Sequence, residues 1–262
     1  MLNIGEINYA NVFPIFNSLK KYQNLKFVSS FPSFLNRAVR EGGVDITPCS
    51  SIEYGRNSSN YLIIPEISIS SITQVKSVCL FSNYDIKYLA GKKVFLTSES
   101  GTSVVLLKII FKKFYDIPVN FTINEMDADA FLYIGDKALF EYYNKNFKYI
   151  YDLGNEWYNF TSLPFVYALW LVTKEAVSQK KEEIEEFKNI LLKIKSNSKQ
   201  NLSALIDHYY FKGLSSYQII DYWETIDYEL SEKHIKGLKE FFKMAHEIGE
   251  IKSVPDINFL NV

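Results

Sequence analysis

Short apolar runs alternate with stretches of helical periodicity through the first eighty residues of the chain. Short apolar runs have the length of strands, whereas apolar residues spaced three and four apart mark one face of a helix. This alternation predicts an α/β fold with a mostly parallel sheet covered by helices. The expected order is strand 4–7, helix 15–22, strand 25–30, helix 33–43, strand 44–50, a short helix from Ser51, and strands 61–70 and 75–82.

The alternation starts again near residue 84. From Lys174 onward the pattern becomes helical, and Ser231 is a suitable N-cap for the last expected helix, 231–251. Between these points we expect strand 92–100, helix 101–115, strands 119–125 and 128–135, helix 136–145, strand 148–153 and a long apolar strand 163–175.

Two α/β units in series, followed by a helical C-terminal tail, predict a bilobal protein. Residues 1–83 together with 173–262 would form the first lobe, and residues 84–172 the second. The apolar stretches 75–82 and 163–172 would be the two segments that cross between the lobes. The cleft between the lobes is then the expected ligand site.

The composition argues against several classes of partner. The chain has 262 residues and a net charge of −1, so no overall field favours nucleic acid or an anionic membrane. Its two cysteines, Cys49 and Cys79, form neither a disulfide framework nor a metal-ligand spacing, and no metal or cofactor is expected. The N-terminus lacks a signal-peptide pattern, and the longest apolar run, 163–172, is about half a membrane span. We therefore expect a soluble, cytoplasmic protein.

Hydroxyl side chains gather where a predicted strand at 44–50 is followed by a helix. Ser50 and Ser51 stand at the start of that helix, and Glu53 has the spacing of a capping box with Ser50. The hydroxyl and N–H groups can simply cap the helix. They can also face the cleft and bind an anion, and the two roles are compatible.

A second turn, TSESGTS at 97–103, is richer in hydroxyl groups than capping alone requires. A glycine in it permits a close backbone approach, and the following helix offers unpaired N–H groups and a positive dipole end. Such a turn can bind a carboxylate or phosphate without lysine or arginine, and it lacks the P-loop pattern. The candidate anion-binding residues are Ser100, Gly101, Thr102 and Ser103.

Two isolated polar residues follow or interrupt buried strands. Ser77 lies among apolar residues on a crossing segment, and Asp136 begins a helix after strand 128–135. Structural roles, a backbone hydrogen bond and a helix cap, are alternatives for both. The three histidines all fall in the helical tail, and neither a nucleophile elbow nor a GxGxxG fingerprint is present. An enzyme of this sequence would build its site from amides, hydroxyls and helix ends.

Asn8 and Asn11 place uncharged amides where the first strand ends, which is the edge at which open α/β sheets bind ligands. Six motifs in one order then make the chain similar to the chorismate dehydratase family of the futalosine route to menaquinone, over roughly residues 3–175. They are NYANVFP, GGVDITPCSSIEYGR, SISSITQVKSVCLFS, TSESGTSVVLLK, ADAFLYIGDKALF and YDLGNEWYNFTSLPFVYALW.

The resemblance implies a fold like type II periplasmic binding proteins and the conversion of chorismate to 3-[(1-carboxyvinyl)oxy]benzoate and water. It implies that Asn11 and Ser77 face the reacting centre as catalytic residues. The expected partner is therefore a small-molecule substrate, chorismate, and no nucleic acid or membrane; the sequence leaves the oligomeric state open. The residues expected to bind substrate are Ser50, Ser51, Ser100, Gly101, Thr102, Ser103 and Asp136.

Two relatives in fold are the main alternatives. The sibling 1,4-dihydroxy-6-naphthoate synthase resembles a pattern with a histidine in an Ile-His-Glu motif, whereas this chain reads IGD and has Gly135 at that place. A non-catalytic binding protein for a small anion fits the hydroxyl-rich turns equally well. The absence of a signal sequence and the specific motif set favour the dehydratase. A ligand-sensing regulator would need an output module, and no basic helix-turn-helix segment is present.

The resemblance also suggests a mechanism for the reaction that it implies. The turns 49–51 and 100–103 could each hold one of the two carboxylates of chorismate. An amide is a poor base at neutral pH, so Asn11 would orient the substrate, and the enolpyruvyl carboxylate of the substrate would remove the C3 proton. Ser77 would hold a carboxylate or the departing C4 hydroxyl. Glu53 and Asp136 are candidates for assisting that departure.

Overall fold

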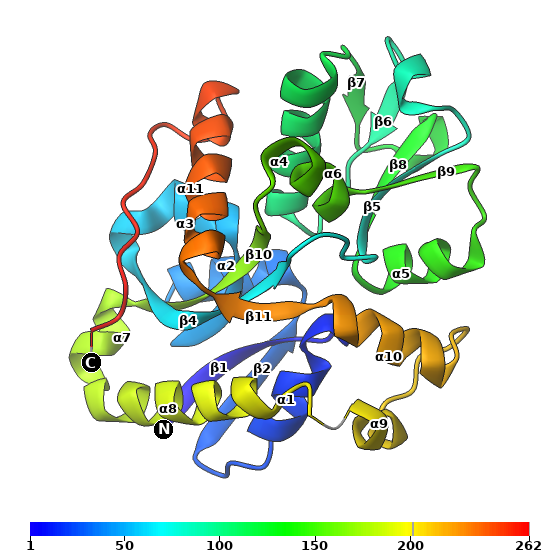
Figure 1. The fold of residues 1–262 in the computed structure, drawn as a ribbon. Coiled ribbons are helices and arrows are strands. Elements are labelled where there is room, and N and C mark those ends of the chain that lie inside the picture. The colour runs from blue at the N-terminus through cyan, green and yellow to red at the C-terminus, as the bar shows by residue number, and fades with distance from the viewer. Residues whose placement is uncertain (201, 262) are drawn as a thin grey trace.

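The computed structural model describes residues 1–200 and 202–261. They form two lobes, each built around one sheet (Figure 1). The first lobe, at the lower left of Figure 1, contains both chain ends and a six-stranded sheet. The second lobe, at the upper right, has a five-stranded sheet with α4, α5 and α6 around it. The bilobal α/β architecture expected from the sequence is therefore confirmed.

The first sheet has the strand order β11-β4-β10-β3-β1-β2. Its strands are β1 (Leu2–Ile7), β2 (Leu25–Ser30), β3 (Ile46–Ser50), β4 (Tyr61–Ser71), β10 (Phe165–Thr173) and β11 (Asp227–Leu230). The helices of this lobe are α1 (Phe13–Leu19), α2 (Pro32–Arg40), α3 (Ser51–Asn57), α7 (Lys174–Gln179), α8 (Lys181–Asn197), α9 (Leu202–Leu205), α10 (Ser216–Thr225) and α11 (Glu232–Glu247). A short 3₁₀ turn, η1 (Ala10–Val12), follows β1.

The second sheet has the order β7-β6-β8-β5-β9. Its strands are β5 (Val78–Ser82), β6 (Lys93–Phe95), β7 (Asn120–Thr122), β8 (Ala130–Ile134) and β9 (Tyr149–Asp152). Its helices are α4 (Gly101–Ile109), which continues as a π-helical segment η4 (Ile110–Tyr115), α5 (Gly135–Asn144) and α6 (Leu153–Thr161). The expected strands at 92–100 and 119–125 are shorter than predicted, because only three residues of each pair with a neighbour.

The prediction of mostly parallel sheets was wrong. β1 is parallel to β2 and β3, but β10 is antiparallel to both β3 and β4. In the second sheet β5 is likewise antiparallel to β8 and β9. The reason is the double crossing between lobes. A strand that comes from the other lobe begins at the interface between the lobes and runs away from that interface. Its neighbours run toward the interface and end at it, so the pair is antiparallel.

The sheets also divide the chain differently from the expected lobe ranges. The expected range 1–83 places β5 in the first lobe, but β5 pairs only with strands of the second sheet. The expected range 84–172 places most of β10 in the second lobe, but β10 lies inside the first sheet. The connections between the sheets are therefore the segments 72–77 and 162–164, which we call the first and second crossing segments.

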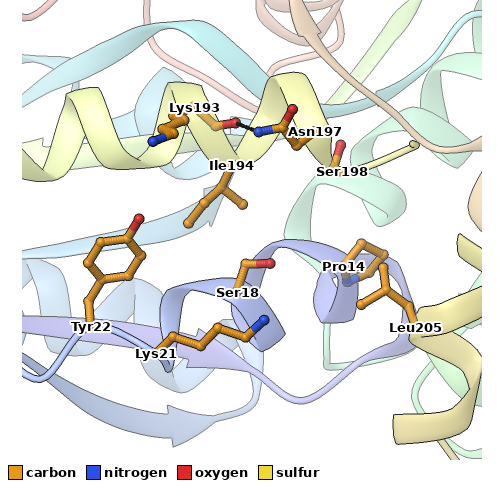
Figure 2. Close-up of a pocket in the computed structure, with 9 residues that line it drawn as sticks. All are labelled: Pro14, Ser18, Lys21, Tyr22, Lys193, Ile194, Asn197, Ser198 and Leu205. Atoms are coloured by element: carbon orange, nitrogen blue, oxygen red, sulfur yellow. Dashed lines mark hydrogen bonds between the residues drawn. The ribbon is translucent and has the colours of Figure 1, made fainter. Parts of the chain in front are cut away.

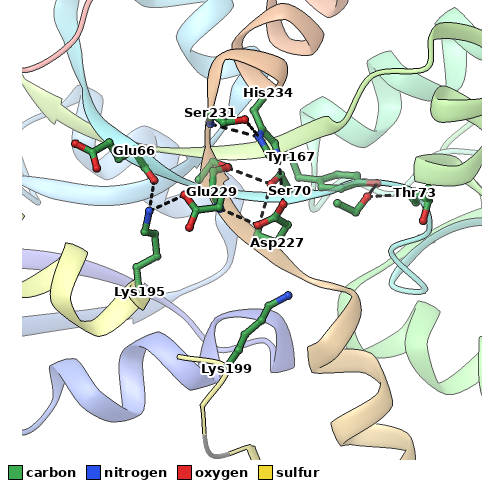
Figure 3. A network of polar contacts seen from close by, with 12 residues as sticks. Glu66, Ser70, Thr73, Tyr167, Lys195, Lys199, Asp227, Glu229, Ser231 and His234 are labelled. Carbon is green, nitrogen blue, oxygen red and sulfur yellow. Dashed lines mark hydrogen bonds and ion pairs between the residues drawn. The ribbon is translucent and has the colours of Figure 1, made fainter. Parts of the chain in front are cut away.

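Two elements were not expected from the sequence. α6 begins after Asp152, whose carboxylate accepts hydrogen bonds from the N–H groups of Gly154 and Asn155 and so caps a segment of modest helix propensity. β11 interrupts the helical tail and extends the first sheet. Lys195 of α8 supports it, because its ammonium contacts the Glu66 carbonyl and the Glu229 carboxylate (Figure 3). Ser231 is the N-cap of α11, as expected.

Apolar packing joins the lobes behind the second crossing segment. Trp157 of α6, Phe165 of β10 and Phe241 of α11 are all buried, and their rings meet edge to face. Ring centroids are 5.2 Å apart for Trp157–Phe165 and 5.1 Å apart for Phe165–Phe241. Within the described residues, no helix has the length and apolar character needed to cross a membrane.

Candidate active site

A cavity lies where the two lobes meet, at the ends of β1, β3 and β8. Its empty space of about 590 Å³ includes open solvent at its mouth. Its lining residues are Ile7, Tyr9, Asn11, Pro32, Ser50, Ile69, Val75, Ser77, Val78, Ser100, Ser103, Ile134, Gly135, Tyr167 and Ala168. None of these described residues carries a formal charge, so any ligand is met by hydroxyl, amide, phenol and backbone groups.

Asn11 contributes an unsatisfied amide to the cavity. Its Oδ1 is buried and has no hydrogen-bond partner. The surrounding backbone is held in place: Tyr228 donates to the Asn11 carbonyl at 2.7 Å, and Trp223 Nε1 donates to the Ala10 carbonyl at 2.8 Å. Because a buried polar atom without a partner costs free energy, this fixed and unpaired amide is suited to a ligand that completes it.

Ser77 lies on the first crossing segment, directly before β5. Its Oγ accepts a hydrogen bond from the Tyr222 hydroxyl at 2.8 Å, and its carbonyl accepts from the N–H of Gly135 at 2.8 Å. Since the Oγ acts as acceptor toward Tyr222, its own hydrogen remains free to donate to a ligand in the cavity. Burial raises the pKa of Tyr222 well above its ordinary value, so this phenol stays a donor.

Ser50 ends β3 and reaches the cavity from the first lobe. Asn36 of α2 fixes it twice, donating from Nδ2 to Ser50 Oγ at 3.0 Å and accepting from the Ser50 N–H at 3.3 Å. The predicted capping box with Glu53 was wrong, because Ser50 makes no side-chain cap bond. Glu53 Oε1 instead accepts from Asn57, from Tyr61 and from the guanidinium of Arg40.

Ser100 and Ser103 bring the start of α4 to the cavity. Ser100 is the N-cap and accepts from the Ser103 N–H at 3.2 Å, and the two hydroxyl oxygens are 2.9 Å apart. The first turn of α4 therefore presents hydroxyls, free N–H groups and the positive end of the helix dipole. These are the groups from which the sequence predicts an anion site, and that role stays a prediction.

Four of the predicted substrate-binding residues do not line the cavity. Ser51 is buried and donates to the Val166 carbonyl at 2.7 Å, and Thr102 is buried and accepts from the Ile52 N–H at 3.0 Å. Gly101 allows close packing, because a Cβ there would lie 2.9 Å from a methyl group of Ile52. These residues join α3 to its neighbours, and their role at the cavity is indirect.

Asp136 is the fourth. It stands in the first turn of α5, but its Oδ1 accepts from the Ala10 N–H of the other lobe at 3.1 Å. Burial raises the pKa of this carboxyl, and the Ala10 N–H partly offsets that effect. Asp136 therefore anchors η1, the turn that carries Asn11, from behind the cavity.

Several functional contacts were not found from the sequence. Tyr9 lines the cavity, donates to Glu99 Oε2 at 3.0 Å and packs its ring against Gly135. Gly135 has φ +58°, and a Cβ there would lie 3.1 Å from the Tyr9 ring, so a side chain at this position would strain the backbone and press on Tyr9. Tyr9 lies within the motif NYANVFP and could have been noticed, whereas Tyr222 of the helical tail carries no local signal.

Figure 2 shows a different and more open pocket, between α1 and α8. It contains Lys21 and Lys193 and none of the predicted site residues.

Figure 3 shows Ser231, His234 and Asp227 in the order of a catalytic triad. The serine is the N-cap of α11, and its own N–H also donates to His234 Nδ1 at 3.3 Å, so the trio caps a helix and braces β11. Across residues 1–200 and 202–261, no group of side chains could hold a metal ion.

Solved structures confirm the expected fold. A structural-genomics protein from Archaeoglobus fulgidus is 18% identical with a TM-score of 0.77, covering 95% of this chain and 98% of that chain. A Candida albicans protein described as having the generic periplasmic binding protein fold is 11% identical with a TM-score of 0.71, covering 100% and 98%. The alkanesulfonate-binding protein of Xanthomonas axonopodis pv. citri, solved with MOPS, is 12% identical with a TM-score of 0.71, covering 98% and 95%. At these identities the likeness shows the fold alone.

Curated relatives point to one activity. The chorismate dehydratase of Campylobacter jejuni strain 81-176 is 30% identical over 247 residues, which is 91% of this chain and 95% of that protein. The chorismate dehydratase of Thermus thermophilus is 30% identical over 193 residues, 66% of this chain and 70% of that protein. The model of the family described as menaquinone biosynthesis matches residues 2–247, nearly the whole chain, and the chain therefore belongs to the menaquinone biosynthesis family.

Proposed function

We propose that this protein is a chorismate dehydratase, which converts chorismate to 3-[(1-carboxyvinyl)oxy]benzoate and water in the futalosine route to menaquinone. The observation that carries the proposal is that Asn11, Ser77, Ser50, Ser100 and Ser103 line a single cavity between the lobes. The two curated relatives named chorismate dehydratase support the same activity.

The cavity is suited to a dianion although it contains no lysine or arginine among its lining residues. The start of α4 offers Ser100, Ser103 and free N–H groups, and Ser50 offers a hydroxyl fixed by Asn36. Charge-assisted hydrogen bonds from these groups can hold the two carboxylates of chorismate. Apolar residues such as Ile7, Ile69 and Val78 line the rest of the cavity, where the ring can lie.

The reaction removes the C3 proton and the C4 hydroxyl, and the ring becomes aromatic. No aspartate, glutamate or histidine is among the lining residues that the structure describes, so no ordinary protein base faces the ring. We assign proton removal to the enolpyruvyl carboxylate of the substrate. The protein then contributes position, with Asn11 orienting the substrate and Ser77 donating to a carboxylate or to the departing hydroxyl.

A direct test is to incubate the purified protein with chorismate and to follow substrate and product by ultraviolet absorbance and chromatography. We expect stoichiometric formation of 3-[(1-carboxyvinyl)oxy]benzoate. Ser77→Ala should lower turnover by at least about tenfold, roughly 1.4 kcal/mol of transition-state stabilisation. Binding of chorismate without its consumption would instead support a small-anion binding protein and overturn the dehydratase.

A second test addresses the source of the base. In Asn11→Asp, a carboxylate replaces the amide next to a bound dianion, and repulsion should lower activity. A gain of activity with a new acidic pKa in the rate profile would show that a protein base serves better, and the substrate-assisted mechanism would fall. The sibling naphthoate synthase activity is disfavoured because this chain has Gly135 at the place of the histidine in the sibling's motif.

A further inference from the structure

The carboxylate of Asp152 lies buried where the first crossing segment meets the start of α6. It accepts hydrogen bonds from four backbone N–H groups. Two belong to α6, from Gly154 at 3.0 Å and Asn155 at 3.2 Å. The other two belong to the crossing segment, from Val75 at 2.9 Å and Lys76 at 2.6 Å. Capping α6 needs only the first pair, so the second pair calls for a separate explanation.

The crossing segment has an unusual backbone at the residue before Ser77. Lys76 has φ +62°, in the left-handed region that residues with a side chain rarely adopt. Such a conformation persists only where its surroundings hold it. The Asp152 carboxylate grips the N–H groups of Val75 and Lys76 on one side of this turn, and the carbonyl of Ser77 accepts from Gly135 on the other.

Helix α10 holds the side chains of the same turn. Lys76 Nζ is paired with the Asp221 carboxylate at 2.8 Å and lies 3.2 Å from the Asp221 carbonyl. The next residue of α10, Tyr222, donates to Ser77 Oγ. Adjacent residues of the turn are thus bound by adjacent residues of one helix. A shift of the turn would separate Ser77 from Tyr222 and change where its hydroxyl hydrogen points in the cavity.

We propose that Asp152 is a positioning residue for the reaction: it fixes the left-handed turn at 75–77 and thereby aims the Ser77 hydroxyl at the substrate. The inference rests on the proposed function. It adds a residue that touches no substrate but sets the geometry of one that does, and misplacement of a reacting contact by about 1 Å can lower turnover by about a hundredfold.

Matched variants test this role. Asp152→Asn loses an acceptor oxygen, and kcat should fall about tenfold or more while KM changes by less than about threefold. Glu156→Gln is the control, because Glu156 is a buried carboxylate of the same helix whose Oε2 accepts from Tyr115 at 2.6 Å, and none of the hydrogen bonds described for the turn involves it. We expect Glu156→Gln to retain kcat within about twofold.

A double-mutant cycle separates positioning from general damage. If Asp152 acts through Ser77, Asp152→Asn should lower kcat no further in a Ser77→Ala background, because the two effects are not additive. Independent losses that multiply would overturn the inference, as would unchanged kcat in Asp152→Asn alone. An inactive wild type would overturn the proposed function itself, and the inference with it, so the two failures are distinguishable.

A pH profile serves if Asp152→Asn does not fold. Burial raises the pKa of Asp152 to about 6, and the four N–H groups oppose that shift. The groups that face it are Cys79 of β5, Tyr142 of α5 and Tyr167 of β10, which are neutral below pH 8. Because each oxygen of the Asp152 carboxylate already accepts at least two hydrogen bonds from N–H groups, an added proton must displace one of these bonds.

Wild-type kcat should therefore fall below about pH 6 while circular dichroism shows that the fold is intact. This fall should vanish in Ser77→Ala. A flat profile, or one shared by Ser77→Ala, would contradict the role.

Discussion

The two crossing segments join the same pair of lobes by different forces. Segment 72–77 is held by buried polar contacts, with Asp152 on its backbone and Tyr222 on Ser77. Segment 162–164 is held by apolar packing around Phe165 and Phe241. Hydrogen bonds have direction, whereas packing is non-directional and scales with buried area. Directional contacts that place Ser77 and apolar contacts that hold the lobes together therefore lie at separate places in the structure.

The largest effect is expected from weakening the apolar joint, which is the packing of Trp157, Phe165 and Phe241 at the second crossing segment. Phe241→Ala removes a buried ring that meets both Trp157 and Phe165, and it should lower the free energy of unfolding by about 3–5 kcal/mol. Urea denaturation measures this loss. Turnover per folded molecule should stay within about twofold, because no contact of Ser77 changes. A large fall in kcat at conditions where the variant is folded would show that the two joints are not separate.

The polar joint is the first crossing segment with its hydrogen bonds to Asp152 and Tyr222. Its contribution to the free energy of unfolding should fall as pH rises. The folded pKa of Asp152, about 6, lies above its ordinary value of 3.8, so the folded state binds the proton more tightly than the unfolded state. The contribution of Asp152 to stability is therefore greatest below about pH 4 and declines by up to about 3 kcal/mol as pH rises to 6 and above.

Denaturation of the wild type and of Asp152→Asn between pH 4 and 7 isolates that contribution, since other carboxylates titrate in both proteins. The stability difference between them should move against the wild type as pH rises. A difference that grows in favour of the wild type would mean that ionised Asp152 stabilises the fold, and would reverse the expected sign.

The second crossing segment also depends on a close approach. Gly237 of α11 lies against the carbonyl oxygen of Pro164, and an added Cβ would collide with it. Gly237→Ala should therefore cost about 1–3 kcal/mol of stability through overpacking. Thermal unfolding measures this loss of stability. Gly91→Ala is unsuitable as a control, because Gly91 has φ +73° and an alanine there would be strained. Gly43→Ala is the better one, since its nearest neighbour is at 3.4 Å.

The smallest expected effect concerns the left-handed residue of the polar joint. Lys76→Gly and Lys76→Ala both remove the ion pair with Asp221, and they differ only in how readily they adopt φ +62°. The glycine variant should be more stable by about 1 kcal/mol, and its kcat should be the higher of the two. Equal stability and equal kcat would show that the turn relaxes without consequence.

Much of the fold could be predicted from local pattern. The expected strand 25–30 agrees with β2 at both ends, and the junction of β3 and α3 at Ser50 and Ser51 lies where the pattern predicts it. The order of elements through residue 150 followed from periodicity. Strand direction could not, because whether β5 and β10 join the near or the far sheet depends on the path of the chain between lobes.

The missed elements and contacts have a common cause. β11 is only four residues long and is a strand because β4 offers it an edge, and α6 depends on a buried cap at Asp152. Asn11 and Ser77 were candidates because of the family resemblance, and the first turn of α4 because of its many hydroxyl groups; all of them line the cavity. Asn36 and Tyr222 act on those residues from other helices, at separations in sequence of 14 and 145 residues, and no local pattern reveals them.

The neutral lining of the cavity has a consequence for catalytic turnover. In the proposed reaction only water departs, so chorismate and its product carry the same two negative groups, and a grip based on those groups retains both alike. Product release must then depend on shape. The puckered cyclohexadiene of the substrate becomes a flat benzene ring in the product. The apolar and aromatic lining of the cavity, which includes Tyr9 and Tyr167, would fit these two ring shapes differently.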